Sequence, residues 1–118
     1  MKYMILIYEP ESAFEGEVGE RRLTDIVGKH MALAAELTEA GIQLGGAGLQ
    51  PAHTATTIRT DAAGGQALHD GPFAETHEQL GGYYLIEVAN LDEAIAIGKR
   101  VPVAPGGKVE VRPLMDHD

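Results

Sequence analysis

The stretch YYLIEVANLDEAIAIGKR, residues 83–100, joins a strand to a helix and decides the fold. Residues 83–88 are mostly aromatic, apolar or β-branched, a composition typical of a strand. Asn90 predicts an N-cap, because its side-chain oxygen can accept a hydrogen bond from an unpaired backbone N–H of the first helical turn. Glu93 follows three residues later, as in a capping box. The helix is predicted to run to about Arg100, where two prolines in the next five residues stop it.

The rest of the chain supplies a longer helix and further strands. Between residues 20 and 40, apolar residues recur at spacings of three and four, which predicts an amphipathic helix that Gly41 ends. Gly28 inside this helix is expected to mark a close backbone contact. The acidic, glycine-bearing residues 11–20 are expected to form a surface loop. The remaining predicted strands are 2–8, 54–60, 66–69 and 108–112, with a turn at 61–65. The glycine-rich residues 42–49 are predicted to form a short strand or a turn.

The order of these elements predicts an α+β fold. Two helices separate the strands so that both cover one face of an antiparallel sheet, which is a ferredoxin-like arrangement. A chain of 118 residues is sufficient for one core, and neither linkers nor repeats divide it. We therefore expect a single domain over residues 1–118.

The first strand also predicts an assembly. Both of its alternating sets of side chains are largely apolar, and the strand at 83–88 repeats this pattern. Two helices can bury only one face of a sheet, so the other face would expose a large apolar patch. A second copy packed sheet against sheet would cover it, and a homodimer is predicted. The alternating sets are Tyr3, Ile5 and Ile7 against Met4, Leu6 and Tyr8.

Composition excludes several classes of partner. The formal net charge is −9, and Lys and Arg are not clustered, which disfavours nucleic acid and anionic membrane surfaces. There is no cysteine, so disulfides and thiolate metal sites are excluded. Neither a phosphate-binding loop nor a zinc motif occurs, and no cofactor or metal is expected. The N-terminal apolar run is too short for a signal peptide, so a cytoplasmic protein is expected.

Two places could carry chemistry. His30 lies on or beside the apolar face of the predicted helix, where it would either complete a core hydrogen bond or face a pocket as an acid or base. Asp70 opens a turn with the following Gly-Pro pair, and a purely structural turn explains those three residues. It does not explain the polar residues that follow before the strand. We take His30 and Asp70 as candidate catalytic residues, with Glu75, His77 and Tyr83 as candidate ligand-binding residues.

A resemblance extends over nearly the whole chain. KYMILIY, AGIQLGGAGLQP, ATTIR, DGPFAETHEQLGGYYLIEV, LDEAIAIGKRVP and GGKVEVRPL resemble the DGPF-domain family of the YCII-related proteins. The resemblance implies a ferredoxin-like domain that dimerises through its sheets as a dimeric α/β barrel. It also implies a histidine–aspartate acid–base site, with His30 in KHMALAAEL at the place expected for the histidine. Asp70 is then the candidate aspartate.

Two functions from different classes follow. The first is a small cofactor-independent enzyme that moves a proton on a carbonyl or lactone-like molecule, with His30 as acid or base and Asp70 orienting it. The second is a non-catalytic ligand-binding or regulatory module, since some relatives are associated with extracytoplasmic-function sigma factors. A carboxylate beside His30 in a pocket would favour the enzyme, whereas an apolar pocket with His30 bonded to backbone would favour the module.

Overall fold

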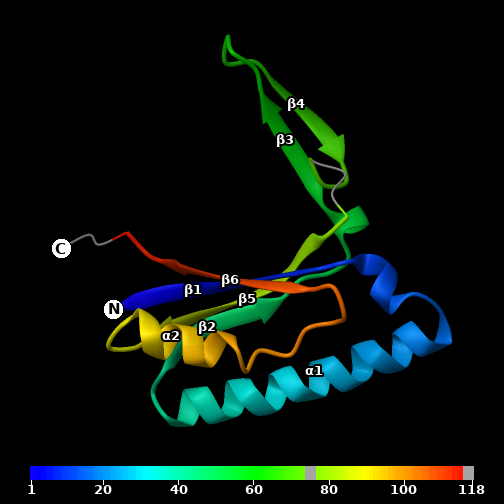
Figure 1. The fold of residues 1–118 in the computed structure, drawn as a ribbon. Coiled ribbons are helices and arrows are strands. Elements are labelled where there is room, and N and C mark those ends of the chain that lie inside the picture. Colours follow the sequence, from blue (N-terminus) through cyan, green and yellow to red (C-terminus); the bar gives the residue numbers. More distant parts are fainter. Residues whose placement is uncertain (74–76, 116–118) are drawn as a thin grey trace.

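The computed structural model of the protein describes residues 1–73 and 77–115 (Figure 1). Four strands form an antiparallel sheet in the order β2-β5-β1-β6, and two helices, α1 and α2, lie on one side of it. This is the strand order of a ferredoxin-like fold, so the predicted α+β class is confirmed. The sheet consists of β1 (Lys2–Glu9), β2 (Gln43–Gly48), β5 (Gln79–Glu87) and β6 (Lys108–Pro113), and the helices are α1 (Gly16–Glu39) and α2 (Leu91–Gly98).

The core lies between the sheet and the two helices. Alternation along β1 turns its odd-numbered residues toward the helices, and Ile5 is completely buried there. The even-numbered residues of β5 face the same way, and Ile86 is also completely buried. Leu37 from the last turns of α1 completes the most tightly enclosed part of the core, which therefore sits at the C-terminal end of that helix.

Helix α1 begins earlier than the predicted residue 20. Residues 11–20 are not a simple loop, because a 3₁₀ helix, η1 (Glu11–Phe14), leads into α1 at Gly16. Gly16 has a φ of +69°, a conformation that suits glycine at this junction. Gly19 packs so tightly that a Cβ there would lie 2.2 Å from the Phe14 carbonyl carbon. The close contact expected at Gly28 is wrong, since a Cβ there would meet no atom within 4 Å.

The predicted start of α2 is confirmed. Asn90 Oδ1 accepts a hydrogen bond of 3.0 Å from the Glu93 backbone N–H, and Glu93 Oε2 accepts one of 2.9 Å from Ala89 N–H. Two N–H groups that the helix itself cannot pair are thus satisfied by these side chains. The helix ends at Gly98, two residues before the predicted end, and Arg100 instead bonds through its guanidinium to the Glu36 carboxylate at 2.6 Å.

A separate hairpin stands away from the sheet on the side opposite the helices (Figure 1). It consists of β3 (Thr56–Thr60) and β4 (Gln66–Asp70), preceded by the short 3₁₀ helix η2 (Ala52–Thr54). The predicted turn at 61–65 is confirmed, because Asp61 Oδ1 accepts hydrogen bonds of 2.9 Å from the N–H groups of Ala63 and Gly65. Its cross-strand pair Ile58 and Leu68 is 61% and 74% exposed, so nothing described in the chain covers it.

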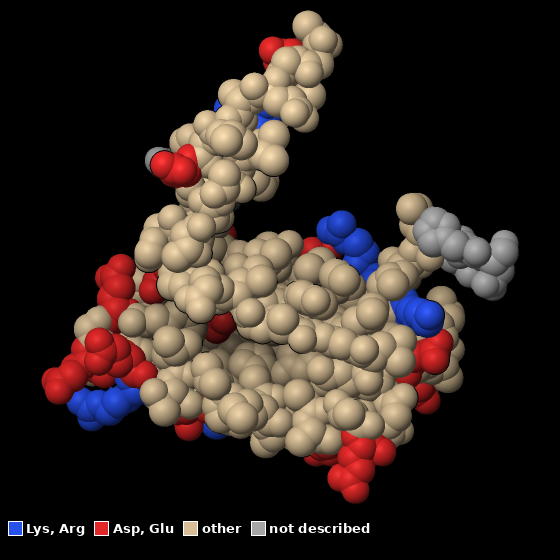
Figure 2. Space-filling view, turned by 180° about the vertical axis from the view of Figure 1, so that it is seen from behind, with Lys and Arg blue, Asp and Glu red and all other residues tan. Residues whose placement is uncertain are grey.

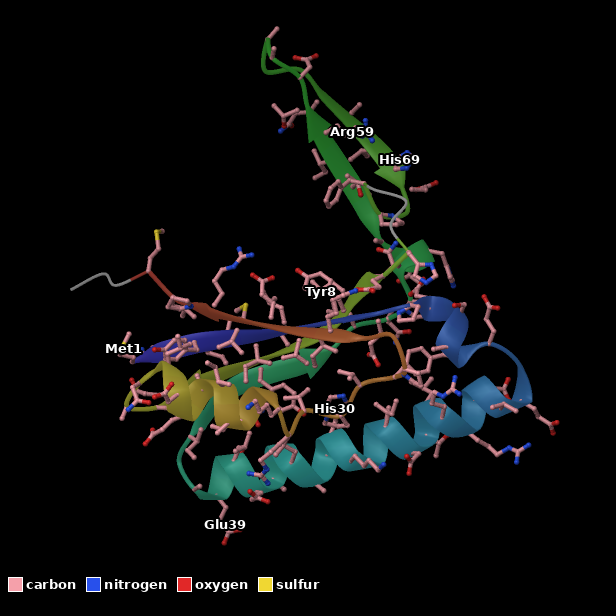
Figure 3. The ribbon with its side chains drawn as sticks, viewed as in Figure 1. Met1, Tyr8, His30, Glu39, Arg59 and His69 are labelled. Carbon is pink, nitrogen blue, oxygen red and sulfur yellow. The ribbon has the colours of Figure 1, made fainter. Side chains whose placement is uncertain are left out.

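The sheet face opposite the helices is apolar and uncovered in the single chain. Along β1 and β5 its side chains are half-buried by one another, while β6 contributes charged side chains at the edge. Tyr8 points to this side in Figure 3, away from the helices. The apolar set is Met4, Leu6, Tyr8, Tyr83 and Leu85.

Candidate functional site

An open cavity of about 660 Å³ lies between the N-terminal two-thirds of α1 and the sheet. The sheet side of this space has few side chains, because Gly46, Gly48 and Gly82 occupy consecutive helix-facing positions on β2 and β5. At Gly82 a Cβ would lie 2.9 Å from the Ala47 carbonyl oxygen, so the close pairing of the two strands requires glycine there. The sequence GGAG and the GG before the tyrosines therefore create the cavity by leaving space beneath α1.

The helix side of the cavity is apolar. Leu23, Val27 and Met31 line it and are 45%, 46% and 69% exposed, respectively. Such exposure of three large apolar residues on the inner side of a helix follows from the lack of sheet side chains opposite them. Figure 2 shows the surface hollowed below the base of the hairpin, with uncharged atoms around the hollow and acidic atoms beside it. The space is accessible to a small molecule and apolar over most of its wall.

His30 and Tyr84 meet in the wall of this cavity. The Nδ1 atom of His30 lies 2.5 Å from the Tyr84 hydroxyl oxygen, and the ring centroids are 5.7 Å apart. Tyr84 is on the helix-facing side of β5, and its cross-strand neighbour on β2 is Gly46, which has no side chain. Figure 3 shows His30 rising from α1 toward the sheet. The helix period thus brings an imidazole to a phenol that is 54 residues away in the chain.

The environment keeps both groups of this pair uncharged near neutral pH. Burial lowers the pKa of His30 below 6.5, and a hydrogen bond with the Pro102 backbone partly opposes that lowering. Burial also raises the pKa of the Tyr84 phenol above 10.0. A neutral imidazole beside a neutral phenol can exchange a proton without first losing or gaining one to solvent.

A buried carboxylate borders the same cavity. Glu9 at the end of β1 is only 8% exposed, and its Oε2 accepts a hydrogen bond of 2.7 Å from the Ala104 N–H. Gly81 makes room for it, because a Cβ at that position would lie 3.3 Å from Glu9 Oε1. The Ala104 backbone N–H therefore holds the carboxylate in place. Glu9 is also one of the residues that line the cavity.

An amide also lines the cavity with an unused acceptor. Gln43 at the start of β2 faces the helices, because it pairs with Ile86 on the buried side of β5. Its Oε1 atom is buried and has no hydrogen-bond donor among the residues that the structure describes. A buried acceptor without a donor costs about 1–3 kcal/mol. This atom has almost no accessible surface, so a ligand would pair with it only after the Gln43 amide turned toward the cavity, and the missing hydrogen bond favours such a turn.

The predicted site residues do not all come together. His30 lines the cavity, but Asp70 does not; it is exposed at the end of β4 on the projecting hairpin, next to the His69 labelled in Figure 3. Tyr83 borders the cavity, yet alternation along β5 turns its side chain to the face opposite Tyr84. In the single chain the side chain bonded to His30 is that of Tyr84, and not that of Asp70.

The two other predicted ligand-binding residues lie elsewhere. His77 is exposed and lines a second hollow of about 550 Å³ at the base of the hairpin, together with Tyr8 and Phe73. Glu75 lies outside the described residues. Across residues 1–73 and 77–115, no three His, Asp or Glu side chains gather closely enough to hold a metal ion. No helix in the same ranges is long and apolar enough to cross a membrane.

Sequence reasoning missed three residues of the cavity. Tyr84 could have been assigned from alternation, since it shares a face with the core residue Ile86. The sequence signal for Glu9 was weaker, because a glutamate at the end of an apolar strand is usually exposed to solvent. Gln43 gave none, since its role depends on how β2 pairs with β5.

Comparison with known proteins places the whole chain in one family. The model of the YCII-related domain matches residues 1–118. An uncharacterized protein of Rhizobium meliloti (strain 1021), R00369, is 41% identical over 119 residues, which cover 97% of this chain and 92% of that protein. This agrees with the four-stranded antiparallel sheet and two helices described above. The chain belongs to the YCII-related family.

Proposed function

We propose that the protein is a cofactor-independent acid–base enzyme that moves a proton on a small carbonyl or lactone-like molecule bound between α1 and the sheet. The observation that carries this proposal is the hydrogen bond between His30 Nδ1 and the Tyr84 hydroxyl in the wall of an open cavity. Both partners titrate, and burial favours the neutral form of each, since it lowers the pKa of His30 and raises the pKa of Tyr84.

The direction of proton flow follows from the hydrogen-bond partners. A neutral imidazole carries a single N–H, and the Pro102 carbonyl can only accept. In the proposed tautomer Nε2–H of His30 donates to Pro102 and Nδ1 accepts from the Tyr84 hydroxyl. A substrate C–H next to a carbonyl then gives its proton to the Tyr84 oxygen while the phenol proton moves to His30. The enolate and the imidazolium form together, and return of the proton at another carbon completes an isomerisation.

Asp70 has a separate place in this proposal. Its pairing with His30 stays a prediction, since in the single chain the hairpin carries Asp70 on an exposed position outside the cavity. A conformational change or a second copy of the chain would have to bring the two side chains together. Asp70→Asn tests this directly, because loss of activity equal to that of a His30 variant would support the dyad.

The second candidate function is a non-catalytic binding module. Both features that were expected to favour such a module support it: the wall of the cavity is mostly apolar, and His30 has a backbone hydrogen-bond partner in Pro102. The His30–Tyr84 pair would then fix the orientation of the ligand. The two functions share the binding step and differ in whether a proton of the ligand is exchanged.

An experiment on a neutral lactone separates them. Conversion of α-angelica lactone to its conjugated isomer requires removal and return of one carbon-bound proton, and deuterium uptake from D₂O reports each event by NMR. His30→Gln and Tyr84→Phe are each expected to reduce the rate by at least about 100-fold, since an acid–base residue contributes that much or more. His69→Gln on the exposed hairpin is the histidine control and should leave the rate unchanged.

The outcomes separate cleanly. Exchange that depends on His30 and Tyr84 supports the enzyme. Binding of the lactone, seen as shifts of the His30 ring signals, with no exchange above buffer would leave only the binding module. Exchange that survives both variants would place the chemistry elsewhere in the chain.

A further inference from the structure

We infer that the ligand of this cavity is an uncharged or cationic molecule that donates hydrogen bonds from a hydroxyl or amine group, and that carboxylates and phosphates are excluded. The inference deepens the proposed function, and it rests on the same cavity being the binding site. It concerns only the charge and hydrogen-bonding groups of the ligand. It therefore stands or falls separately from the question of catalysis.

The first observation is the sign of the charge around the cavity. Its lining includes the carboxylates of Glu9, Glu11 and Glu15, and among the described residues no Lys or Arg lines it. Arg22 is not among the lining residues, and its guanidinium is held by a hydrogen bond of 2.6 Å to the Ala13 carbonyl. An anionic ligand would thus meet carboxylates in the described lining and no Lys or Arg there to offset them.

The second observation concerns the burial of one of these carboxylates. Glu9 is almost fully buried, and its identified donor within hydrogen-bond distance is a neutral backbone N–H. A charge in such a position is only partly compensated by neutral donors, so an approaching amine or hydroxyl gains more there than it would at an exposed carboxylate. Glu11 differs, because it is exposed and its Oε2 accepts from the Ala52 N–H at 2.7 Å.

The third observation is the unused acceptor of Gln43. Its buried Oε1 atom has no donor in the described part of the chain, and it can only accept a hydrogen bond. If the amide turns toward the cavity, a hydroxyl or amine of the ligand would pair with this oxygen. The Nε2 group of the same amide can donate, so the exclusion of anions rests on the charge of the lining and not on Gln43. Charge and hydrogen bonding therefore select the same class of head group, while the apolar wall of α1 suits a hydrocarbon body.

For the proposed reaction, this class narrows the substrate. A carbonyl or lactone that also carries a hydroxyl or an amino group fits the cavity. A lactone with a free carboxylate does not fit it, even though its reacting carbonyl would be the same.

Three probes with one hydrocarbon body test the inference. Benzylamine, benzyl alcohol and benzoate differ only in the head group, and their binding can be measured near neutral pH by NMR titration of the protein signals. Benzylamine and benzyl alcohol are expected to shift the signals of His30 and Tyr84, with benzoate binding at least about tenfold more weakly than either. The order of the three probes on the unaltered protein already decides the matter.

Variants identify the groups responsible. Glu9→Gln keeps an oxygen for the Ala104 N–H and removes the charge. The affinity for benzylamine should therefore fall by about tenfold or more, while the affinity for benzyl alcohol changes little. Glu17→Gln removes an equal charge from the exposed first turn of α1, outside the cavity, and should change neither. Gln43→Leu should lower the affinity for both benzylamine and benzyl alcohol relative to the unaltered protein.

Contrary results are equally specific. Benzoate that binds as tightly as benzylamine, or shifts from benzylamine that appear only away from His30 and Tyr84, would overturn the inference. If Glu9→Gln does not fold, the ranking of the probes on the unaltered protein still gives the answer. Lactone turnover together with a preference for benzoate would sink this inference alone, while the expected ranking without turnover would sink only the proposed catalysis.

Discussion

At the scale of single residues, the polar side chains of the site depend on neighbouring glycines, whose lack of a side chain leaves them space. Gly46 lets β2 pair closely with β5, because a Cβ there would lie 2.8 Å from the Tyr83 carbonyl oxygen, and Gly81 leaves room for Glu9. His30 then reaches Tyr84 across an otherwise open space. The chemistry of this cavity is thus fixed by glycines on the sheet as much as by the polar side chains themselves.

The pH dependence of stability should report the burial of His30. Its pKa in the folded protein is below the 6.5 of an unperturbed histidine, so the unfolded chain takes up this proton first as the pH falls. The contribution of His30 to stability is therefore present above about pH 6.5 and is lost progressively below it. Urea unfolding between about pH 7.5 and 5.5 should show a steeper loss for the unaltered protein than for His30→Gln. Equal slopes for the two proteins would contradict the burial of this ring.

A larger side chain should have different effects at two glycines on the sheet side of the cavity, changing ligand binding at Gly48 and stability at Gly82. A Cβ at Gly48 would meet no atom within 4 Å, so Gly48→Val should partly fill the cavity and weaken benzyl alcohol binding without loss of stability.

At Gly82 a Cβ would lie 2.9 Å from the Ala47 carbonyl oxygen. Gly82→Ala should therefore destabilise by about 1–3 kcal/mol, measured by urea unfolding. A stable Gly82→Ala protein would mean that the two strands can separate at no cost.

At the scale of elements, the ends of helices and strands carry the local information. Asn90 and Glu93 fix where α2 begins, through side-chain oxygens that pair with backbone N–H groups. Helix α1 and strand β5 each begin several residues before the positions that composition favoured. In both cases the added segment contains a glycine that another part of the chain packs against, Gly19 against Phe14 and Gly82 against Ala47.

The cap of α2 offers a direct test. Asn90→Ala removes the acceptor for the Glu93 N–H and should lower the free energy of unfolding by about 1 kcal/mol. Asn90→Ser, which keeps a capping oxygen, is the matched control and should recover most of that loss. If Asn90→Ala unfolds at the same urea concentration as the unaltered protein, the cap contributes no net stability.

At the scale of the whole molecule, one face of the sheet and one hairpin lack cover. We propose that a second copy of the chain packs on the face formed by Met4, Leu6, Tyr8, Tyr83 and Leu85. The hairpin stands on that same side of the sheet and exposes Ile58 and Leu68, which a second copy could also contact (Figure 1). Burial of these apolar surfaces would supply the free energy of association.

Light scattering tests the homodimer. A mass about twice the 12.6 kDa of one chain is expected at micromolar concentration. Leu85→Asp should return the mass to that of a monomer, since a buried unpaired charge costs several kcal/mol. Val18→Asp introduces the same charge on an exposed position of α1 and should leave the dimer intact. A monomer mass for the unaltered protein would contradict the proposed homodimer.

The sequence by itself determined the fold and one residue of the site. Apolar and β-branched composition predicted five strands, helical periodicity predicted two helices, and residues 42–49 fitted either a strand or a turn. Asn90 followed from local hydrogen bonding alone. His30 was placed on an inner face by helical periodicity, and the structure puts it in the cavity wall.

Only the tertiary structure decided what His30 faces. Its neighbour Tyr84 is 54 residues away, and their contact depends on the pairing of β2 with β5 and on how α1 crosses that pair. Asp70 was the predicted partner of His30, but the hairpin leaves the sheet and carries Asp70 outward in the single chain. Local patterns record which side of an element is buried; the distance between two elements, and the space left between them, depend on the packing of the whole chain.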